Sequence, residues 1–437
     1  MFKFRSLLFL FLLIPFINIF SKLEFSEYQI FAELGDAKSQ CYLGACYTEA
    51  HCVEKDLDKA FEWYSKSAER GYAPAQCLMG MCYEEGNGVA QNYGKAFEWF
   101  KKSAEQDCAF AQFKLAICYQ EGDGVDKDLD KAFEWYSKSA ERGYAPAQAY
   151  IGACFEDGNG VEKDPVQAFE WYKKAAEQGY AIAQFKLAIC YDEGDGVEKD
   201  VIKAFEWYLK VAENGDMLAQ YLVGAMYSLG EGVEQNYENA VKWYFKAAEQ
   251  GSDQAQFELG VYYYKGWGVN RDLAKAVEWY KKSAEQGHAI AQCYLGACYD
   301  EGDGVGKDVI KAFEWYLKSA EHVYAPAQCM VGFCYGEGNG VEQNYGKAFE
   351  WYKKSAEQGE AVAQNNLGDC YENGLGVDKD TNKAFEWYLK AAEQGIALSQ
   401  RSIAMFYENG IGVEKDLQKA AEWKAKAEAT ENSSQDN

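Results

Sequence analysis

Side chains able to do chemistry are few and scattered in this chain. The three histidines, His51, His288 and His322, are far apart and lack the spacing of metal ligands or of a catalytic triad. No serine is followed three residues later by a lysine, so the serine β-lactamase nucleophile pattern is missing. The recurrent Gly-x-Gly-Val turns lack the Lys-Ser/Thr pair of a phosphate-binding loop. We therefore predict a protein that is not an enzyme, with no metal site and no cofactor.

Carboxylates are the one chemical group that gathers locally. Residues 191–200 hold five of them in ten positions, which would suit calcium, but the spacing does not fit an EF-hand loop. Glu84-Glu85 and Asp192-Glu193 fall near a predicted helix C-terminus, where negative charge is mildly unfavourable. The pattern favours a solvated edge or an acidic ridge for a basic partner.

These residues are carried by a repeat of constant length. Eleven tryptophans recur every 36 residues, from Trp63 to Trp423, without insertion or deletion. A constant period of this length is typical of a stacked array of helical units. Eleven such units span residues 37–432. Residues 22–36 resemble a second half-repeat that would cap the stack, and residues 433–437 are expected to be a disordered tail.

One repeat reads as two amphipathic helices joined by a glycine turn. Residues 75–83 and 96–104 each carry an apolar helical stripe. Asn92 stands where the second helix needs an N-cap. Gly80 would let the paired helices approach closely, and we expect the repeated tryptophan to fill the seam between them. The predicted fold is therefore all-α, an α/α superhelical solenoid of helix–turn–helix repeats.

Fourteen cysteines follow the same register. Eight share one repeat position and four share another, and equivalent positions in neighbouring repeats lie about 8–10 Å apart. A disulfide needs Cα atoms within roughly 7 Å, so most of these residues are expected to be buried thiols. Cys52 and Cys108 fall outside both positions and are the better candidates for a disulfide or a reactive thiol.

Charge and the N-terminal segment restrict the partners and the compartment. The net charge of −25 repels phosphate, which argues against nucleic acid and anionic lipid and leaves basic or neutral protein partners open. Residues 1–21 begin with Lys3 and Arg5 and continue in an apolar run too short to span a bilayer. This predicts a signal peptide, with an uncleaved anchor as the alternative, and hence an extracytoplasmic location. No other stretch of the sequence is apolar enough to span a membrane.

The repeat pattern itself resembles a known family. The stretch from Leu295 to Tyr316 shows the motif Leu-Gly-x-x-Tyr-x-x-Gly-x-Gly-Val-x-x-Asp-x-x-Lys-Ala-x-x-Trp-Tyr. It resembles the Sel-one-like repeat family, relatives of the tetratricopeptide repeat, along about nine-tenths of the chain. The resemblance implies an α/α superhelix with a concave binding surface and an adaptor role in protein complexes. The shared motif is scaffold, so no functional residue carries over.

A cysteine-rich secreted branch of that family is linked to penicillin binding and β-lactamase activity. In that branch a cysteine of the second helix pairs with one near the start of the next repeat. Here the second helix has Ser67, Ala175 and Ala391 at such places, so that disulfide framework is absent. A secreted hydrolase of this kind stays as the alternative function.

Candidate partner-binding residues are those that depart from the repeat. The most divergent stretch, from Asp216 to Gly268, adds Tyr262, Tyr264 and Trp267, the one tryptophan out of register. A turn residue such as Trp267 should be exposed, and exposed aromatic residues are typical interface anchors. Local repacking around Tyr262 is the other interpretation.

A second group of candidates lies at the most variable position of the first helix. Its members are Tyr42, Leu78, Lys114, Tyr150, Leu222, Glu258, Tyr294, Met330 and Asn366. We expect these side chains to line the concave face, with Tyr42, Tyr150 and Tyr294 as binding residues. The sequence thus predicts a non-enzymatic, extracytoplasmic scaffold that binds a protein or peptide.

Overall fold

The computed structural model describes residues 25–435, and these residues form 23 helices without a strand. The expected signal segment, residues 1–21, lies outside this range. In chain order the helices are α2 (Phe25–Glu33), α3 (Ala37–Glu49), α4 (Leu57–Glu69), α5 (Ala73–Glu85), α6 (Tyr93–Ala104), α7 (Ala109–Glu121), α8 (Leu129–Glu141), α9 (Ala145–Asp157), α10 (Pro165–Glu177), α11 (Ala181–Glu193), α12 (Val201–Glu213), α13 (Met217–Leu229), α14 (Tyr237–Glu249), α15 (Asp253–Lys265), α16 (Leu273–Glu285), α17 (Ala289–Glu301), α18 (Val309–Glu321), α19 (Ala325–Glu337), α20 (Tyr345–Glu357), α21 (Ala361–Asn373), α22 (Thr381–Glu393), α23 (Ala397–Asn409) and α24 (Leu417–Gln435).

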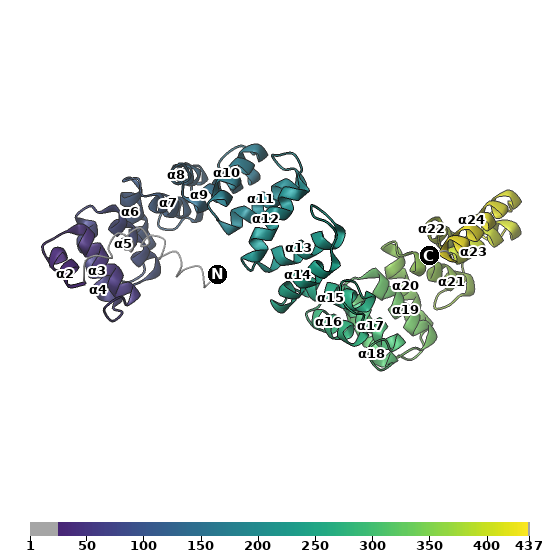
Figure 1. The fold of residues 1–437 in the computed structure, drawn as a ribbon. Coiled ribbons are helices and arrows are strands. Elements are labelled where there is room, and N and C mark those ends of the chain that lie inside the picture. Colours follow the sequence, from purple (N-terminus) through teal and green to yellow (C-terminus); the bar gives the residue numbers. More distant parts are fainter. Residues whose placement is uncertain (1–24, 436–437) are drawn as a thin grey trace. The chain divides into compact units, whose positions relative to one another are not determined.

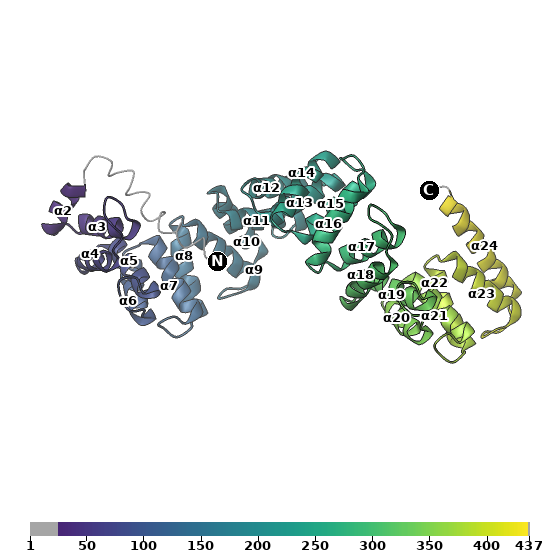
Figure 2. The same ribbon diagram turned by 90° about the horizontal axis from the view of Figure 1, so that it is seen from below.

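The chain divides into two compact units, residues 1–211 and residues 212–437. Within each unit, the first helix of a repeat packs on its own second helix, and that helix packs on the first helix of the next repeat (Figure 1). Figure 2 shows the same alternation from a second direction. The predicted solenoid of helix pairs is confirmed.

Helix ends follow the local sequence. The Asp56 carboxylate accepts a hydrogen bond from the Lys59 amide at 3.0 Å, and Asn92 does the same for Lys95 at 2.9 Å. These caps satisfy backbone donors that a helix start leaves free. First helices end on a glycine such as Gly86, whose φ of 76° is the left-handed conformation that other residues resist. The predicted caps and glycine turn are therefore confirmed.

In ten of the eleven repeats, the seam is filled by the buried aromatic residue after the tryptophan, which corrects the expectation from the sequence. In the last repeat that residue is Lys424, which is exposed. Phe100 and Tyr64 are fully buried, and a Cβ added to Gly80 or Gly44 would lie 2.5 Å from their ring atoms. The glycine is needed because an aromatic ring lies flat against the backbone of the first helix. The predicted close approach is thus confirmed, but the ring is not that of the tryptophan.

The repeated tryptophan lies farther out, at the edge of the core. Trp99 and Trp243 are half-buried, and each is covered by the lysine three residues later on the same helix. The lysine nitrogen lies 4.3 Å from the ring centroid for Lys102 and 3.6 Å for Lys246. One helical turn brings the two side chains to the same face, and the lysine stem shields the ring from water.

A row of buried glutamines links neighbouring repeats. Gln76 donates to the Ala68 carbonyl, and its own side-chain oxygen accepts from Gln106 at 2.7 Å. The oxygen lacks such a donor in Gln40, Gln112, Gln184 and Gln292. At those places the residue 30 positions later is Arg70, Arg142, Asn214 or His322 instead of a glutamine. The row therefore fixes the register between repeats wherever a second glutamine is present.

The two ends of the described chain are helical. α2, in the segment expected to cap the stack, buries Tyr28 and Ala32 against Leu43 of α3. α24 continues to Gln435, so residues 433–435, expected to be disordered, are helical. Residues 436 and 437 lie outside the described range. None of the described helices has the length and apolar character that crossing a membrane requires.

Candidate functional site

The divergent repeat does not present all three of its predicted binding residues. Tyr262 is only 1% exposed, and its hydroxyl donates to the Ser228 side chain at 2.5 Å. Its ring packs edge-on against Tyr244, at 5.5 Å between centroids. Tyr262 replaces the buried cysteine of other repeats and so occupies the core. The burial of Tyr262 favours the interpretation as local repacking for this residue.

Trp267 and Tyr264 point to different neighbours. Trp267 is 40% exposed and stacks on Tyr237 at 5.5 Å, with Tyr262 at its edge. Tyr264 is half-buried and donates to Asp303 at 2.9 Å. Trp267 is thus an exposed ring on a rigid aromatic support, as expected of a turn residue. The hydroxyl of Tyr264 is engaged within the unit.

The sixth residue of every first helix forms a row along each unit, which we call the first-helix row. Its members are Tyr42, Leu78, Lys114, Tyr150, Lys186, Leu222, Glu258, Tyr294, Met330, Asn366 and Ser402. Tyr150 is 38% exposed and Tyr294 is 45% exposed, whereas Tyr42 is half-buried beside Tyr28 of α2. Two of the three predicted tyrosines are therefore open to a partner.

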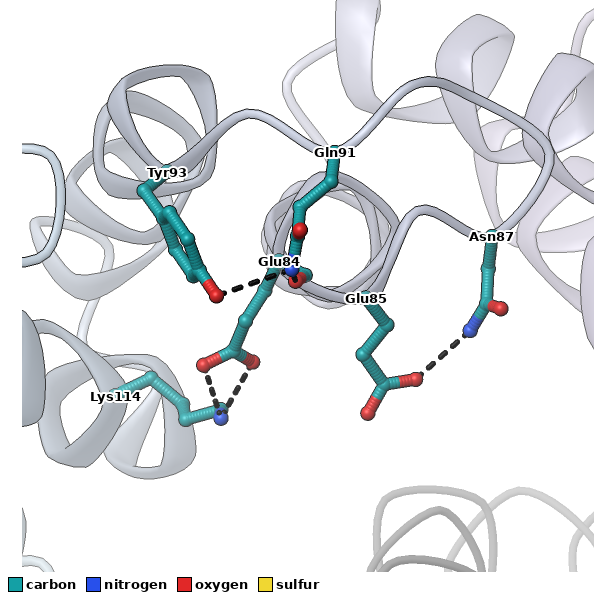
Figure 3. A network of polar contacts seen from close by, with 6 residues as sticks. All are labelled: Glu84, Glu85, Asn87, Gln91, Tyr93 and Lys114. Carbon is teal, nitrogen blue, oxygen red and sulfur yellow. Dashed lines mark hydrogen bonds and ion pairs between the residues drawn. The ribbon is translucent and has the colours of Figure 1, made fainter.

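In the first unit, the row neutralises the acids beside it. Lys114 of α7 contacts both carboxylate oxygens of Glu84 of α5, at 2.9 and 2.6 Å (Figure 3). Lys186 of α11 holds Glu156 of α9 in the same way, at 2.9 Å to each oxygen. Figure 3 also shows the neighbouring Glu85 held by Asn87. The acidic ridge expected at Glu84-Glu85 is thus largely satisfied internally.

In the second unit, the row carries a carboxylate instead of a lysine. Glu258 of α15 is half-buried and forms no ion pair within residues 25–435. Burial raises the pKa of this carboxyl group. The tyrosines around it are Tyr221, Tyr244, Tyr262 and Tyr280. An ionised carboxylate among aromatic rings is a setting that a cationic side chain would stabilise.

The next repeats of the second unit form a groove of about 400 Å³ along the same row. Its apolar wall comes from α17, α19 and α21. The residues concerned are Cys293, Tyr294, Met330, Cys329 and Val362. Tyr294 packs edge-on against Phe257, the residue before Glu258 in the sequence, at 5.3 Å between ring centroids. A second hollow of about 360 Å³ is lined in part by Asn366 and Ser402, two further members of the row.

Three carboxylates border the groove. Asp300 accepts from the Asn339 amide at 3.2 Å, and Glu360 caps α21 by accepting from the Ala363 amide at 2.6 Å. Glu301 is exposed at the end of α17. Within the described part of the chain, none of the three forms an ion pair. The groove therefore combines an apolar wall with negative charge that the unit leaves uncompensated.

The residues able to do chemistry have structural roles or stand alone. The His288 ring accepts from the Ala291 amide at 3.2 Å as an N-cap of α17. His322 is the C-cap of α18, and His51 lies in an exposed turn. No group of three or more metal-binding side chains occurs in the described residues. The cysteines of both shared positions are buried or half-buried free thiols, while Cys52 is exposed.

Sequence reasoning missed Glu258 as a distinct site and did not single out the groove carboxylates. A signal was present, because the row changes from Lys114 and Lys186 to Glu258 at one repeat position. Burial and the ring of tyrosines supply the rest, and neither follows from the repeat pattern.

Comparison with known proteins supports the same architecture. The Sel1 repeat model matches residues 37–72, 73–108, 109–144, 145–180, 181–216, 218–252, 253–288, 289–323, 325–360, 361–396 and 397–427. Among solved structures, c5321, a protective antigen of uropathogenic Escherichia coli strains with an SLR fold, is 38% identical. That similarity covers 95% of this chain and 91% of the antigen, with a TM-score of 0.87.

A second solved relative is a Sel1 repeat protein from Oxalobacter formigenes. It is 34% identical over 71% of this chain and 89% of its own length, with a TM-score of 0.61. No curated protein sequence matches the chain. The repeat matches, the helix pairs and the glycine-lined seams agree, and the chain belongs to the Sel1 repeat family.

Proposed function

We propose that this protein is an extracytoplasmic scaffold that binds a protein partner through the first-helix row of its second unit. The bound segment is extended and basic. The observation that carries the proposal is that Glu258 of the row and the three carboxylates that border the apolar groove form no ion pair within the described residues. Sel1 repeat solenoids are scaffolds that typically mediate protein interaction, which supports the general role.

Charge supports the basic character of the partner. Glu258 lies one repeat before the groove, and Asp300, Glu301 and Glu360 border the groove itself. A lysine or arginine reaching Glu258 would supply the cation that Lys114 and Lys186 supply in the first unit. Because Glu258, Asp300 and Glu360 are partly removed from water, contacts with them are screened less by salt than contacts between fully exposed charges.

Apolar contacts supply the anchoring. Tyr294 is an exposed ring held by Phe257 and Tyr280, so little side-chain freedom is lost when a partner covers it. Met330 beside it is flexible enough to adapt to different apolar side chains. An extended segment suits the row because successive repeats place equivalent side chains at regular intervals.

Binding is tested with fluorescent peptides that alternate apolar residues with lysine, arginine or glutamate. The basic peptides should bind the full chain, and the glutamate peptides should not. Tyr150 offers a matched control, since it has the same repeat position in the first unit and similar exposure to Tyr294. Tyr294→Ala should weaken binding, while Tyr150→Ala leaves it unchanged. Equal effects of the two substitutions would remove the assignment to the second unit.

The compartment is a separate part of the proposal. It rests on the apolar run behind Lys3 and Arg5. Fractionation of the source cells, with N-terminal sequencing of the recovered protein, tests it directly. Recovery outside the cytoplasm supports the proposal, and recovery in the cytoplasm with Met1 in place contradicts it.

The hydrolase alternative gains no specific support from the site. It requires turnover of a β-lactam such as nitrocefin by the purified chain, and we expect none.

A further inference from the structure

Cys108 lies at a position where successive repeats touch. It immediately precedes α7, with the extended backbone of an N-cap at φ −73° and ψ 106°. At the same repeat position, Tyr144 packs against Phe113, and His288 stacks on Phe257 at 5.2 Å. In each pair the second residue is the fifth of the preceding first helix. The fold therefore brings these two repeat positions together.

In one repeat, both the fifth residue of the first helix and the N-cap residue of the next first helix are cysteines. The fifth residue of α5 is Cys77, which is fully buried, and the N-cap residue that meets it is Cys108. Cys77 belongs to a core cluster of buried residues, and Cys108 packs against that same cluster. Cys41 and Cys293 occupy the position of Cys77 in other repeats, but there the N-cap residue is a tyrosine.

The surroundings make the two thiols chemically unequal. The Cys77 thiol, the Ser103 hydroxyl and the amides of Phe110 and Ala111 lower the pKa of Cys108 to about 6. Burial raises the pKa of Cys77 far above its usual range. Lys114, Glu84 and Tyr144 are the other titratable groups near the pair. Cys108 is therefore the thiol that ionises more readily, and Cys77 is the one that keeps its proton.

We propose that Cys108 and Cys77 form a redox-active dithiol that reacts with hydrogen peroxide and closes into a disulfide. The inference is independent of the proposed partner. The Cys108 thiolate attacks one peroxide oxygen, the O–O bond breaks, and hydroxide leaves with Cys108 as a sulfenic acid. The Cys77 sulfur then attacks the Cys108 sulfur. The new S–S bond forms as the sulfenic hydroxyl leaves as water with the Cys77 proton. The hydroxide from the first step takes up the proton that Cys108 lost on ionising, so two thiols and one peroxide give one disulfide and two waters.

The disulfide would tie α5 to the start of α7. It would enclose α6, which lies between the two cysteines, and so close a loop within the repeat of residues 73–108. A cross-link of this kind restricts the unfolded chain and should raise the temperature at which the first unit unfolds. This arrangement differs from the pairing of the cysteine-rich branch, because neither sulfur is on a second helix.

The test is stoichiometric oxidation of the reduced full chain, followed by alkylation and peptide mapping without reductant. We expect one cross-linked peptide joining Cys77 to Cys108 after about one equivalent of peroxide, with Cys52 still alkylated. Cys77→Ser should stop the reaction at a Cys108 sulfenic acid that dimedone traps, and Cys108→Ser should leave Cys77 reduced. Prior oxidation of Cys52, or cross-linking of Cys108 to any other cysteine, would overturn the proposal.

A second measurement does not depend on the cross-link. The rate of Cys108 alkylation by iodoacetamide should be half-maximal near pH 6 in the wild-type chain. A half-maximal rate near pH 9 would contradict the role of Cys108 as the attacking thiol. Circular dichroism of each variant beforehand excludes loss of fold as the cause.

Discussion

In the first unit, Lys114 and Lys186 turn toward Glu84 and Glu156 and satisfy them, whereas in the second unit the same row presents Glu258 without a cation. Both units use the same helix pairs, caps and glycine seams. The difference lies in a position that the scaffold leaves free to vary. A regular solenoid can therefore neutralise the first-helix row in one unit and leave it open to a partner in the other, without changing its core.

The largest expected effect is on stability, and it distinguishes a core residue of the second unit from a nearby surface residue. Tyr262→Ala removes a fully buried ring and should destabilise that unit by about 3–5 kcal/mol. Trp267→Ala, next to it but 40% exposed, should cost less than about 1 kcal/mol. Urea unfolding followed by circular dichroism measures both. A similar loss in the two variants would mean that Trp267 is also part of the core.

The next effect concerns binding. Tyr294→Ala should weaken binding of a basic peptide by about 2 kcal/mol, roughly 30-fold, because the ring is a rigid anchor beside the groove. Titration by fluorescence anisotropy gives the value. Tyr150→Ala, measured alongside, should change binding by less than twofold. Loss of binding in the Tyr150 variant alone would move the site to the first unit.

A third substitution makes the first unit more like the second. Lys114→Met keeps the side-chain length but leaves Glu84 without its cation, which should cost about 1–2 kcal/mol of stability. The uncovered carboxylate should also add weak affinity for basic peptides. Denaturant unfolding and anisotropy follow the two effects. Unchanged stability would show that the Lys114–Glu84 ion pair is no more favourable than the hydration of the two separate charges in the unfolded chain.

The smallest effect has a definite dependence on pH. Burial raises the pKa of Glu258 above its value in the unfolded chain, so the folded state holds the proton more tightly. The protonated Glu258 carboxyl group contributes its full stabilisation at pH values below its pKa in the unfolded chain. This contribution is lost as the pH rises through its pKa in the folded chain. Glu258→Gln should therefore stabilise the second unit at pH 7.

That gain should disappear at about pH 3, below the ordinary glutamate pKa of about 4.3, where Glu258 is protonated in both states. Thermal unfolding at the two pH values measures it. A constant difference between the variant and the wild type would show that the carboxylate is not responsible. The Glu258→Gln variant should also bind basic peptides more weakly. The wild-type carboxylate would then lower the stability of the fold and raise the affinity for the peptide.

The fold was largely predictable because the repeat determines it. The period of 36 residues, the N-caps such as Asn92 and the turn glycines each follow from local chemistry. The role of the tryptophan did not follow. Trp99 and Phe100 are adjacent and both apolar, and only the helix rotation decides that Phe100 meets Gly80 while Trp99 meets Lys102.

The candidate site was predictable only in part. Variability at the first-helix row pointed to Tyr150 and Tyr294, which are exposed. Tyr262 also varied, but it varied because it fills a core position. A residue that diverges from the repeat can therefore lie on the surface, or it can lie in the core where neighbouring residues have changed to accommodate it. Contact between Cys77 and Cys108, which are 31 positions apart, depends on how repeats stack and not on either residue's own position.

Site-specific photocross-linking in the source cells tests the central claim most directly. A photoreactive phenylalanine analogue placed at position 294 is compared with the same analogue at position 150. The account predicts a cross-linked protein at position 294 alone, with the attached peptide rich in lysine or arginine. Cross-linking only at position 150, or to an acidic peptide at position 294, would contradict it.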